Sequence, residues 1–218
     1  RNASSYHISA MEVAKPFGVE FAEIDDWNCC GATEYIALNK MAAYALVARN
    51  LTIAKSQPGN SHTLVAPCSA CFLNLSKAEQ YLCEDEKLRT KINVALAEGG
   101  MHYNAGGLSV RHLLDIFVND VGLDAIAEKV VKPLKGLRIA PYYGCLIVRP
   151  GFQGVFDDHE QPVALDKLMK VLGANVVDFP LKANCCGGHM TQISEPVAMD
   201  LLNRLLKNAA DYEADILV

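Results

Sequence analysis

The chain has 218 residues, of which 51% are apolar and 21% are charged, and its formal net charge is −5. This length and composition support one large core or two small ones, and they exclude a disordered chain, a collagen-like fibre and a disulfide-stapled miniprotein. No basic tract of the kind that binds nucleic acid is present. Apolar runs such as residues 41–48 are far shorter than the roughly 20 residues that span a bilayer. We therefore expect a soluble, cytoplasmic α/β protein with no nucleic-acid partner and no membrane span.

A repeated order of elements predicts two similar units. In the first, Gly18 precedes a short apolar strand at 19–24, and an Asn-Cys-Cys-Gly sequence at 28–31 opens a helix over 34–51. A turn at Pro58-Gly59 then leads to a strand at 63–66 and to the Cys-x-x-Cys motif that begins at Cys68. In the second unit, the predicted elements are a strand at 137–141, a helix that ends at Gly173, a strand at 175–179, a second Asn-Cys-Cys-Gly at 184–187, a helix over 197–209 and a strand at 215–218.

Between these units, residues 84–136 are predicted to form a helical connection. Its helices are expected at 84–98, at 110–118 with Ser109 as N-cap, and at 123–131 before Pro133. Strands that alternate with helices favour parallel pairing. We expect two pseudo-symmetric α/β units, 1–83 and 137–218, with parallel strands and flanking helices. The repeat also predicts that the chain is clipped at both ends, because the first unit lacks an opening strand with its cysteine and the second lacks a closing Cys-x-x-Cys.

The pattern of the cysteines favours a metal site over a disulfide framework. Adjacent cysteines form a disulfide only through a strained ring, and two Cys-Cys pairs occur here. Soft thiolates select zinc, copper(I) or iron–sulfur clusters. Adjacent thiolates reach two irons of a cluster more easily than one ion, so the spacing favours an iron–sulfur cluster, with zinc in one site as the alternative. The candidate ligands are Cys29, Cys30, Cys68, Cys71, Cys145, Cys185 and Cys186.

The order Cys, Cys-Cys-Gly, Cys-x-x-Cys resembles the cysteine-rich CCG domain. The sequences at 26–32, 67–71, 111–114, 132–137 and 140–145 are similar to those of heterodisulfide reductase B subunits. This resemblance implies two noncubane iron–sulfur clusters, each held by five cysteines. It implies reduction of the mixed disulfide of coenzyme M and coenzyme B during methanogenesis. Electrons would arrive through an iron–sulfur protein, the C subunit, together with a flavin-containing protein, the A subunit.

The same resemblance distributes the seven cysteines between two clusters. It assigns Cys29, Cys30, Cys68 and Cys71 to the first and Cys145, Cys185 and Cys186 to the second, so the remaining ligands would lie outside this chain. We therefore expect this chain alone to fold but to be inactive, with any bound metal in the first site. Two other readings stay open: an iron–sulfur subunit of a lactate-, glycolate- or fumarate-linked CCG oxidoreductase, and a zinc-stabilised assembly module without catalysis.

Four residues near these motifs, and one cysteine outside them, carry further expectations. His189 comes shortly after the second Asn-Cys-Cys-Gly motif. We expect it either to donate a proton to a leaving thiolate or to cap the backbone as a loop histidine. Lys182 and Arg149 are expected to meet an acidic substrate tail or to be solvated surface charges. We expect Trp27 to shield the first site, and Cys83 to be a buried free thiol outside both motifs.

Overall fold

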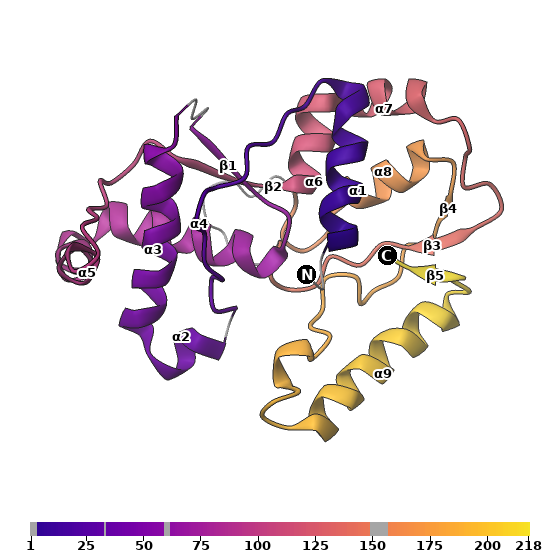
Figure 1. Cartoon of the computed structure of the whole chain (residues 1–218). Coiled ribbons are helices and arrows are strands. Elements are labelled where there is room, and N and C mark those ends of the chain that lie inside the picture. Colours follow the sequence, from indigo (N-terminus) through magenta and orange to yellow (C-terminus); the bar gives the residue numbers. More distant parts are fainter. Residues whose placement is uncertain (1–3, 33, 59–61, 149–156) are drawn as a thin grey trace.

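The computed structural model describes residues 4–32, 34–58, 62–148 and 157–218. In these residues, two small parallel sheets lie in two halves of the molecule, each beside its own helices (Figure 1). The first sheet pairs β1 (Thr63–Ala66) with β2 (Ser109–His112). The second has the order β4-β3-β5, with β3 (Arg138–Ala140) between β4 (Asn175–Val176) and β5 (Ile216–Leu217). The predicted α/β class with parallel strands and flanking helices is confirmed.

Helices account for most of the remaining elements. They are α1 (Ser4–Ala14), α2 (Glu34–Leu38), α3 (Lys40–Ser56), α4 (Ser69–Glu84), α5 (Glu86–Ala97), α6 (Leu113–Asp115), α7 (Leu123–Lys129), α8 (Ala164–Val171) and α9 (Glu195–Asp211). A π-helical segment, Ile116–Gly122, joins α6 to α7, and 3₁₀ turns occur at Lys15–Phe17 and Gly188–Met190. None of the helices in the described part of the chain is both long and apolar enough to cross a membrane.

The single helix predicted over 34–51 is wrong in one respect, because it is divided at Asn39. The Asn39 side chain accepts a hydrogen bond from the backbone N–H of Ala42 at 3.0 Å. Asparagine is a strong N-cap because its side chain satisfies an N–H that has no partner within the helix. The chain therefore stops α2 at Leu38 and starts α3 at Lys40, and α3 continues to Ser56.

The helix predicted at 110–118 is also wrong in its first half. Ser109 begins strand β2 instead of capping a helix, and Leu64 lies opposite Val110 in the parallel register. Val110 and His112 alternate inward and are buried, which is the period of a strand. Pairing with the edge of β1 therefore stabilises a strand here in place of the helix that the local pattern predicts. The predicted connection over 84–136 thus contributes a strand to the first sheet.

Residues 19–24, predicted as a strand, pair with no strand in the described residues. In the second sheet, β3 lies between β4 and β5 and supplies hydrogen bonds to both. The described part of the first half has no strand in the corresponding place. Val19 and Phe21 are instead packed beside Phe117 of the π-helical segment.

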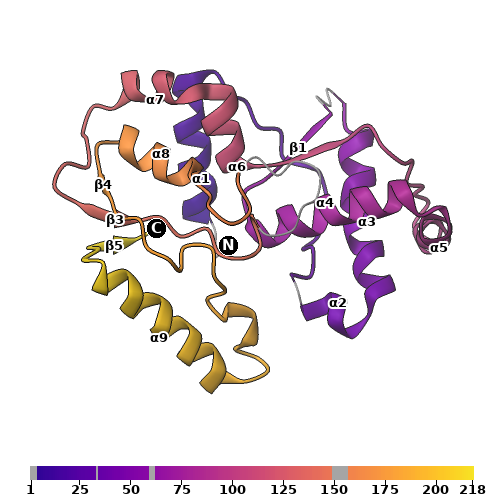
Figure 2. The same cartoon turned by 180° about the vertical axis from the view of Figure 1, so that it is seen from behind.

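The two halves share hydrophobic cores and form one body. Tyr143 and Val148, which follow β3, belong to the same buried cluster as Leu51 and Leu64 of the first half. A second shared cluster joins Ala14 at the end of α1 to residues of the π-helical segment, α7 and α8. Both views place α1 beside α6 and α8 (Figures 1 and 2). This shared packing fixes the position of one cysteine-rich loop relative to the other.

Candidate functional site

The first site brings together cysteines from two motifs. Cys68 follows β1 and is the N-cap of α4, and Cys71 lies in the first turn of that helix. The Cys71 Sγ lies 3.2 Å from the Cys30 Sγ, although the two residues are 41 positions apart. Cys30 is buried, whereas its neighbour Cys29 is exposed. The structure thus gathers three of the four predicted thiols and leaves Cys29 at the rim.

Hydrogen bonds to sulfur lower the pKa of two of these three thiols and raise the pKa of the third. The Cys71 thiol, the Ala32 N–H and the Asn74 amide lower the pKa of Cys30 to about 6, against an opposing effect of burial. The Cys71 thiol and the N–H groups of the first α4 turn lower the pKa of Cys68 to about 5. The pKa of Cys71 is raised, because its hydrogen bonds with Cys30 and Cys68 favour the protonated thiol and burial adds to this effect. Two thiolates at neutral pH are the form in which cysteine binds metals.

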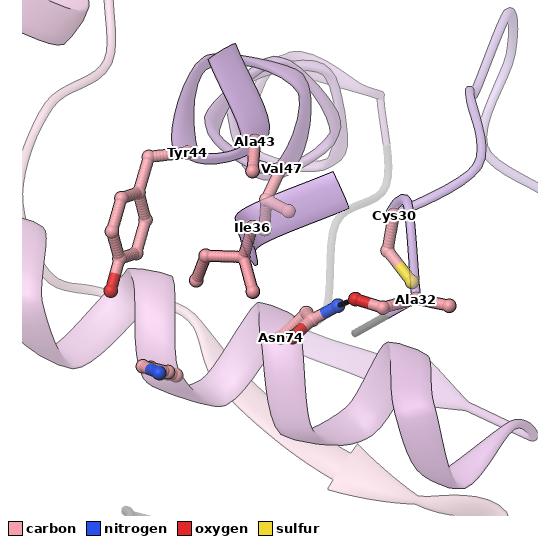
Figure 3. A pocket seen from close by; sticks show the side chains of 8 residues that line it. Cys30, Ala32, Ile36, Ala43, Tyr44, Val47 and Asn74 are labelled. Carbon is pink, nitrogen blue, oxygen red and sulfur yellow. Dashed lines mark hydrogen bonds between the residues drawn. The ribbon is translucent and has the colours of Figure 1, made fainter. Parts of the chain in front are cut away.

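Two buried asparagines hold the loop that carries Cys29 and Cys30. The Asn50 amide donates to the Asn28 carbonyl at 2.7 Å and accepts from the Asn28 N–H at 3.0 Å. These two bonds satisfy the backbone groups that a neighbouring strand would otherwise pair with. The Asn74 amide donates to the Ala32 carbonyl at 2.5 Å (Figure 3). Sequence reasoning missed both residues. The available signal was an asparagine within an otherwise apolar helix face.

The hollow beside Cys30 is too small for a substrate. Ile36, Tyr44 and Val47 line it together with Asn74, and its volume is about 10 Å³ (Figure 3). That volume is close to the minimum for one water molecule. Cys29 and Cys68 are exposed, so the site is open to solvent on their side.

The second site gathers Cys145, Cys185 and Cys186. Burial and the neighbouring Cys185 raise the pKa of Cys145. Tyr142 lies against all three cysteines, and burial together with a hydrogen bond to Cys186 raises the pKa of its phenol. Its hydroxyl donates to the Asn184 carbonyl at 2.7 Å. Tyr142 lies within the motif at 140–145, and its contact with these cysteines could not be predicted from the sequence.

Both Cys-Cys-Gly loops need their glycine. Gly31 and Gly187 both have φ +78°, in the left-handed region that L side chains rarely adopt. A Cβ on Gly31 would lie 2.8 Å from the Cβ of Tyr35, and one on Gly187 would lie 3.0 Å from the Cα of Ala198. The glycines therefore allow each loop to approach the helix that follows it.

Lys182 is buried, which corrects both predicted roles for it. Its ammonium lies 2.9 Å from Asp178 and 3.3 Å from Asp166. Burial acts to lower the pKa of Lys182, but the two carboxylates outweigh it and raise that pKa. Lys182 is therefore neither a solvated surface charge nor open to a substrate tail. Arg149 lies outside the described residues.

His189 connects the two sites. Its Nδ1 lies 2.7 Å from the Glu34 carboxylate at the start of α2, so the predicted backbone cap is wrong. The imidazole is also near enough to Cys68 to help lower the pKa of that thiol. The second Cys-Cys-Gly loop thus lies beside the first site. Proton donation by His189 remains a prediction.

Two other predictions concern residues around the sites. Trp27 is 57% exposed and donates its indole N–H to Glu23 at 2.8 Å, and its shielding of the first site stays a prediction. Cys83 is half-buried and accepts a hydrogen bond from the Gly106 N–H at 3.0 Å, apart from both groups of candidate ligands.

The donor sets agree in kind with iron–sulfur ligation. Both consist of thiols only, which are the donors that soft metals and iron–sulfur clusters select. Two residues of each set are adjacent in sequence, with one thiol more exposed than the other. Within the described residues, no three Cys, His, Asp or Glu side chains are arranged around the position of a single metal ion. Cys29, Cys30, Cys68 and Cys71, and Cys145, Cys185 and Cys186, are the residues that could hold such groups.

Comparisons with known proteins agree with the repeat. The family model described as "CCG: Cysteine-rich domain" matches residues 2–76 and 139–218. The chain is 34% identical over 210 residues to the 8-methylmenaquinol:fumarate reductase membrane anchor subunit of Wolinella succinogenes, which covers 96% of this chain and 71% of that protein. It is 28% identical over 170 residues to the B subunit of the ferredoxin:CoB-CoM heterodisulfide reductase of Methanosarcina mazei, which covers 78% and 55%.

A more distant relative and a solved structure extend this agreement. A protein of Archaeoglobus profundus, described as similar to the B subunit of heterodisulfide reductase, is 24% identical and covers 100% of this chain and 73% of its own length. The crystal structure of a hypothetical protein from Helicobacter pylori superposes with a TM-score of 0.71 at 15% identity, over 99% of this chain and 38% of that one. The last comparison shows a shared fold.

Proposed function

Because the chain belongs to the CCG cysteine-rich domain family, we propose that it is the iron–sulfur subunit of an oxidoreductase complex that reduces a disulfide. The observation that carries this proposal is the position of the two cysteine sites, which lie side by side across the contact between His189 and Glu34. Reduction of a disulfide consumes two electrons and two protons and releases two thiols. Two metal sites beside one substrate suit this stoichiometry.

In this proposal, Cys29, Cys30, Cys68 and Cys71 hold one iron–sulfur cluster, and Cys145, Cys185 and Cys186 hold part of another. When bound, such clusters supply electrons and a Lewis-acidic iron for the sulfur of the substrate. The helix N-terminus at Cys68 stabilises negative charge. The lowered pKa values of Cys30 and Cys68 keep those ligands as thiolates.

We assign protonation of the product to His189. Glu34 accepts from Nδ1 and orients the ring, which leaves Nε2 as the atom that passes a proton to a leaving thiolate. The proposed substrate is the mixed disulfide of coenzyme M and coenzyme B or a related disulfide. The proposed partners, which deliver the electrons in the cytoplasm, are an iron–sulfur protein of the C-subunit type together with a flavin-containing protein of the A-subunit type.

A second candidate function has its own support. The 34% identity to the fumarate reductase subunit extends over 96% of this chain. In that function, the same two cysteine sites would hold the clusters that carry electrons from a quinol towards fumarate reduction, and no disulfide is bound.

The test uses the complete gene product, purified without oxygen. We expect iron and acid-labile sulfide in equal, several-fold excess over protein, and reduction of the heterodisulfide by reduced viologen. The Cys186→Ala variant should lose that activity, whereas the matched Cys83→Ala variant should retain it, because Cys83 lies apart from both sites.

Other outcomes separate the alternatives. Oxidation of a menaquinol analogue coupled to fumarate reduction in the assembled complex, without turnover of a disulfide, would favour the second function. About one zinc per chain with no sulfide would identify an assembly module and refute both redox proposals.

A further inference from the structure

A buried carboxylate lies behind the second site, where no sequence motif points to it. Asp166 is on α8 and is only 5% exposed. Its carboxylate accepts a hydrogen bond from the Tyr143 hydroxyl and lies 3.3 Å from the Lys182 ammonium. A buried carboxylate is retained at such a position only where charged or polar partners compensate for its desolvation.

The two partners of Asp166 come from the two loops that carry the second set of cysteines. Tyr143 lies two residues before Cys145, and Lys182 lies three residues before Cys185. The backbone joins the same loops, because the N–H groups of Tyr143 and Gly144 both donate to the Lys182 carbonyl, at 2.8 and 3.1 Å. Asp166 therefore contacts one side chain from each loop at the point where they meet.

Helix α8 provides a fixed base for these contacts. The Tyr143 hydroxyl accepts from the N–H groups of Leu165 and Asp166 at 2.9 and 3.1 Å, which satisfies donors in the first turn of the helix. The hydroxyl thus donates to the Asp166 side chain and accepts from its backbone. This arrangement holds Tyr143, and with it the loop of Cys145, against one end of α8.

We propose that Asp166 is a positioning residue for the second cysteine site, because it joins the Cys145 loop to the Cys185–Cys186 loop through Tyr143 and Lys182. This inference rests on the proposed function only where it concerns cluster binding. Asp166 does not act by direct contact with the candidate ligands or with a substrate. It acts by setting the distance between the two loops that carry the cysteines.

The first test needs no metal. A bimane reagent with two bromomethyl arms bridges two nearby thiols, and each thiolate displaces one bromide. Mass spectrometry then measures the bridge between Cys145 and Cys185 and, as an internal control, the bridge between Cys68, which is exposed, and Cys71, to which Cys68 is hydrogen-bonded. We expect Asp166→Ala to lower the first bridge about tenfold, the effect of losing a buried charge-assisted hydrogen bond, and to leave the second unchanged.

Two further variants isolate the contact. Tyr143→Phe removes only the hydroxyl and should lower the same bridge by a smaller factor. Asp178→Asn is the matched control, because Asp178 also pairs with Lys182 but its side chain is 79% exposed, and its yields should not change. An unchanged Cys145–Cys185 bridge in Asp166→Ala would overturn the proposal. An equal fall of both bridges in Asp166→Ala and in Tyr143→Phe would overturn it as well, since Asp166 would then support the whole fold.

The second test measures the proposed clusters in the complete protein. Asp166→Ala should lower iron and sulfide to about half and change the spectroscopic signature of one cluster, with the other intact. If the unmodified protein binds no iron, the proposed function fails, and the bridging yields still decide the role of Asp166.

Discussion

Replacement of Gly187 by alanine tests the close approach of the second Cys-Cys-Gly loop to helix α9. The new Cβ would lie 3.0 Å from the Cα of Ala198 and 3.1 Å from its carbonyl oxygen, and both are backbone atoms of the helix. The left-handed backbone costs about 1–2 kcal/mol for an L side chain. Overpacking adds about 1–3 kcal/mol. We therefore expect Gly187→Ala to lower the free energy of unfolding by about 2–5 kcal/mol.

Gly136 provides the matched control. Its φ is +86°, but a Cβ there would meet no atom within 4 Å. Gly136→Ala should therefore cost only the backbone part, about 1–2 kcal/mol. Urea unfolding followed by circular dichroism gives both values from the transition midpoints. Equal losses in the two variants would refute the argument that contact with α9 requires a glycine at 187.

Three other outcomes follow from single groups. Alkylation of Cys68 by iodoacetamide in the metal-free protein should remain fast until the pH falls to about 5, because the pKa of this thiol is lowered. Peptide mass spectrometry measures the alkylation rate at each pH, and a rate midpoint above pH 8 would contradict this expectation. Asn50→Ala should destabilise the fold by about 1–3 kcal/mol in urea, because the partly buried N–H and carbonyl of Asn28 lose their partner, and a loss below about 0.5 kcal/mol would count against the strand-like role of Asn50. Burial lowers the pKa of His112 to about 4, so its contribution to stability is complete above pH ~6.5 and is lost as the pH falls through 4. His112→Asn should therefore flatten the dependence of the unfolding free energy on pH over that range. An unchanged dependence would contradict this role of His112.

The sequence predicted those features that depend on local pattern. The cysteine motifs, the strand at 63–66 and the long helix before β5 all carry their signals within a few neighbouring residues, and the structure has each of them. The division of the helix at Asn39 also had a local signal, an asparagine with N-cap propensity. Strand β2 did not, because the choice between helix and strand at 109–112 was made by the edge of β1, which is distant in sequence.

The candidate site also contains residues with a local sequence signal and residues whose partners only the folded chain brings near. The motifs identified the cysteines, and the structure brings Cys30, Cys68 and Cys71 together. Asn50 and Asp166 could not be identified, because each acts through a partner that only the folded chain brings near. The buried position of Lys182 was missed for the same reason, since its two carboxylate partners come from different elements.

The central position of β3 in the second sheet has a consequence for protein synthesis. Strand β3 pairs with β4 and with β5, and the contact between the Arg138 N–H and Asp215 joins residues 77 positions apart. On the ribosome, β3 emerges long before β5, and parallel pairing over such a separation closes slowly. The edge of β3 that faces β5 stays open until then, while Cys68 and Cys71 already share a finished helix. The first group of cysteines is thus assembled while the second half of the molecule is still being completed.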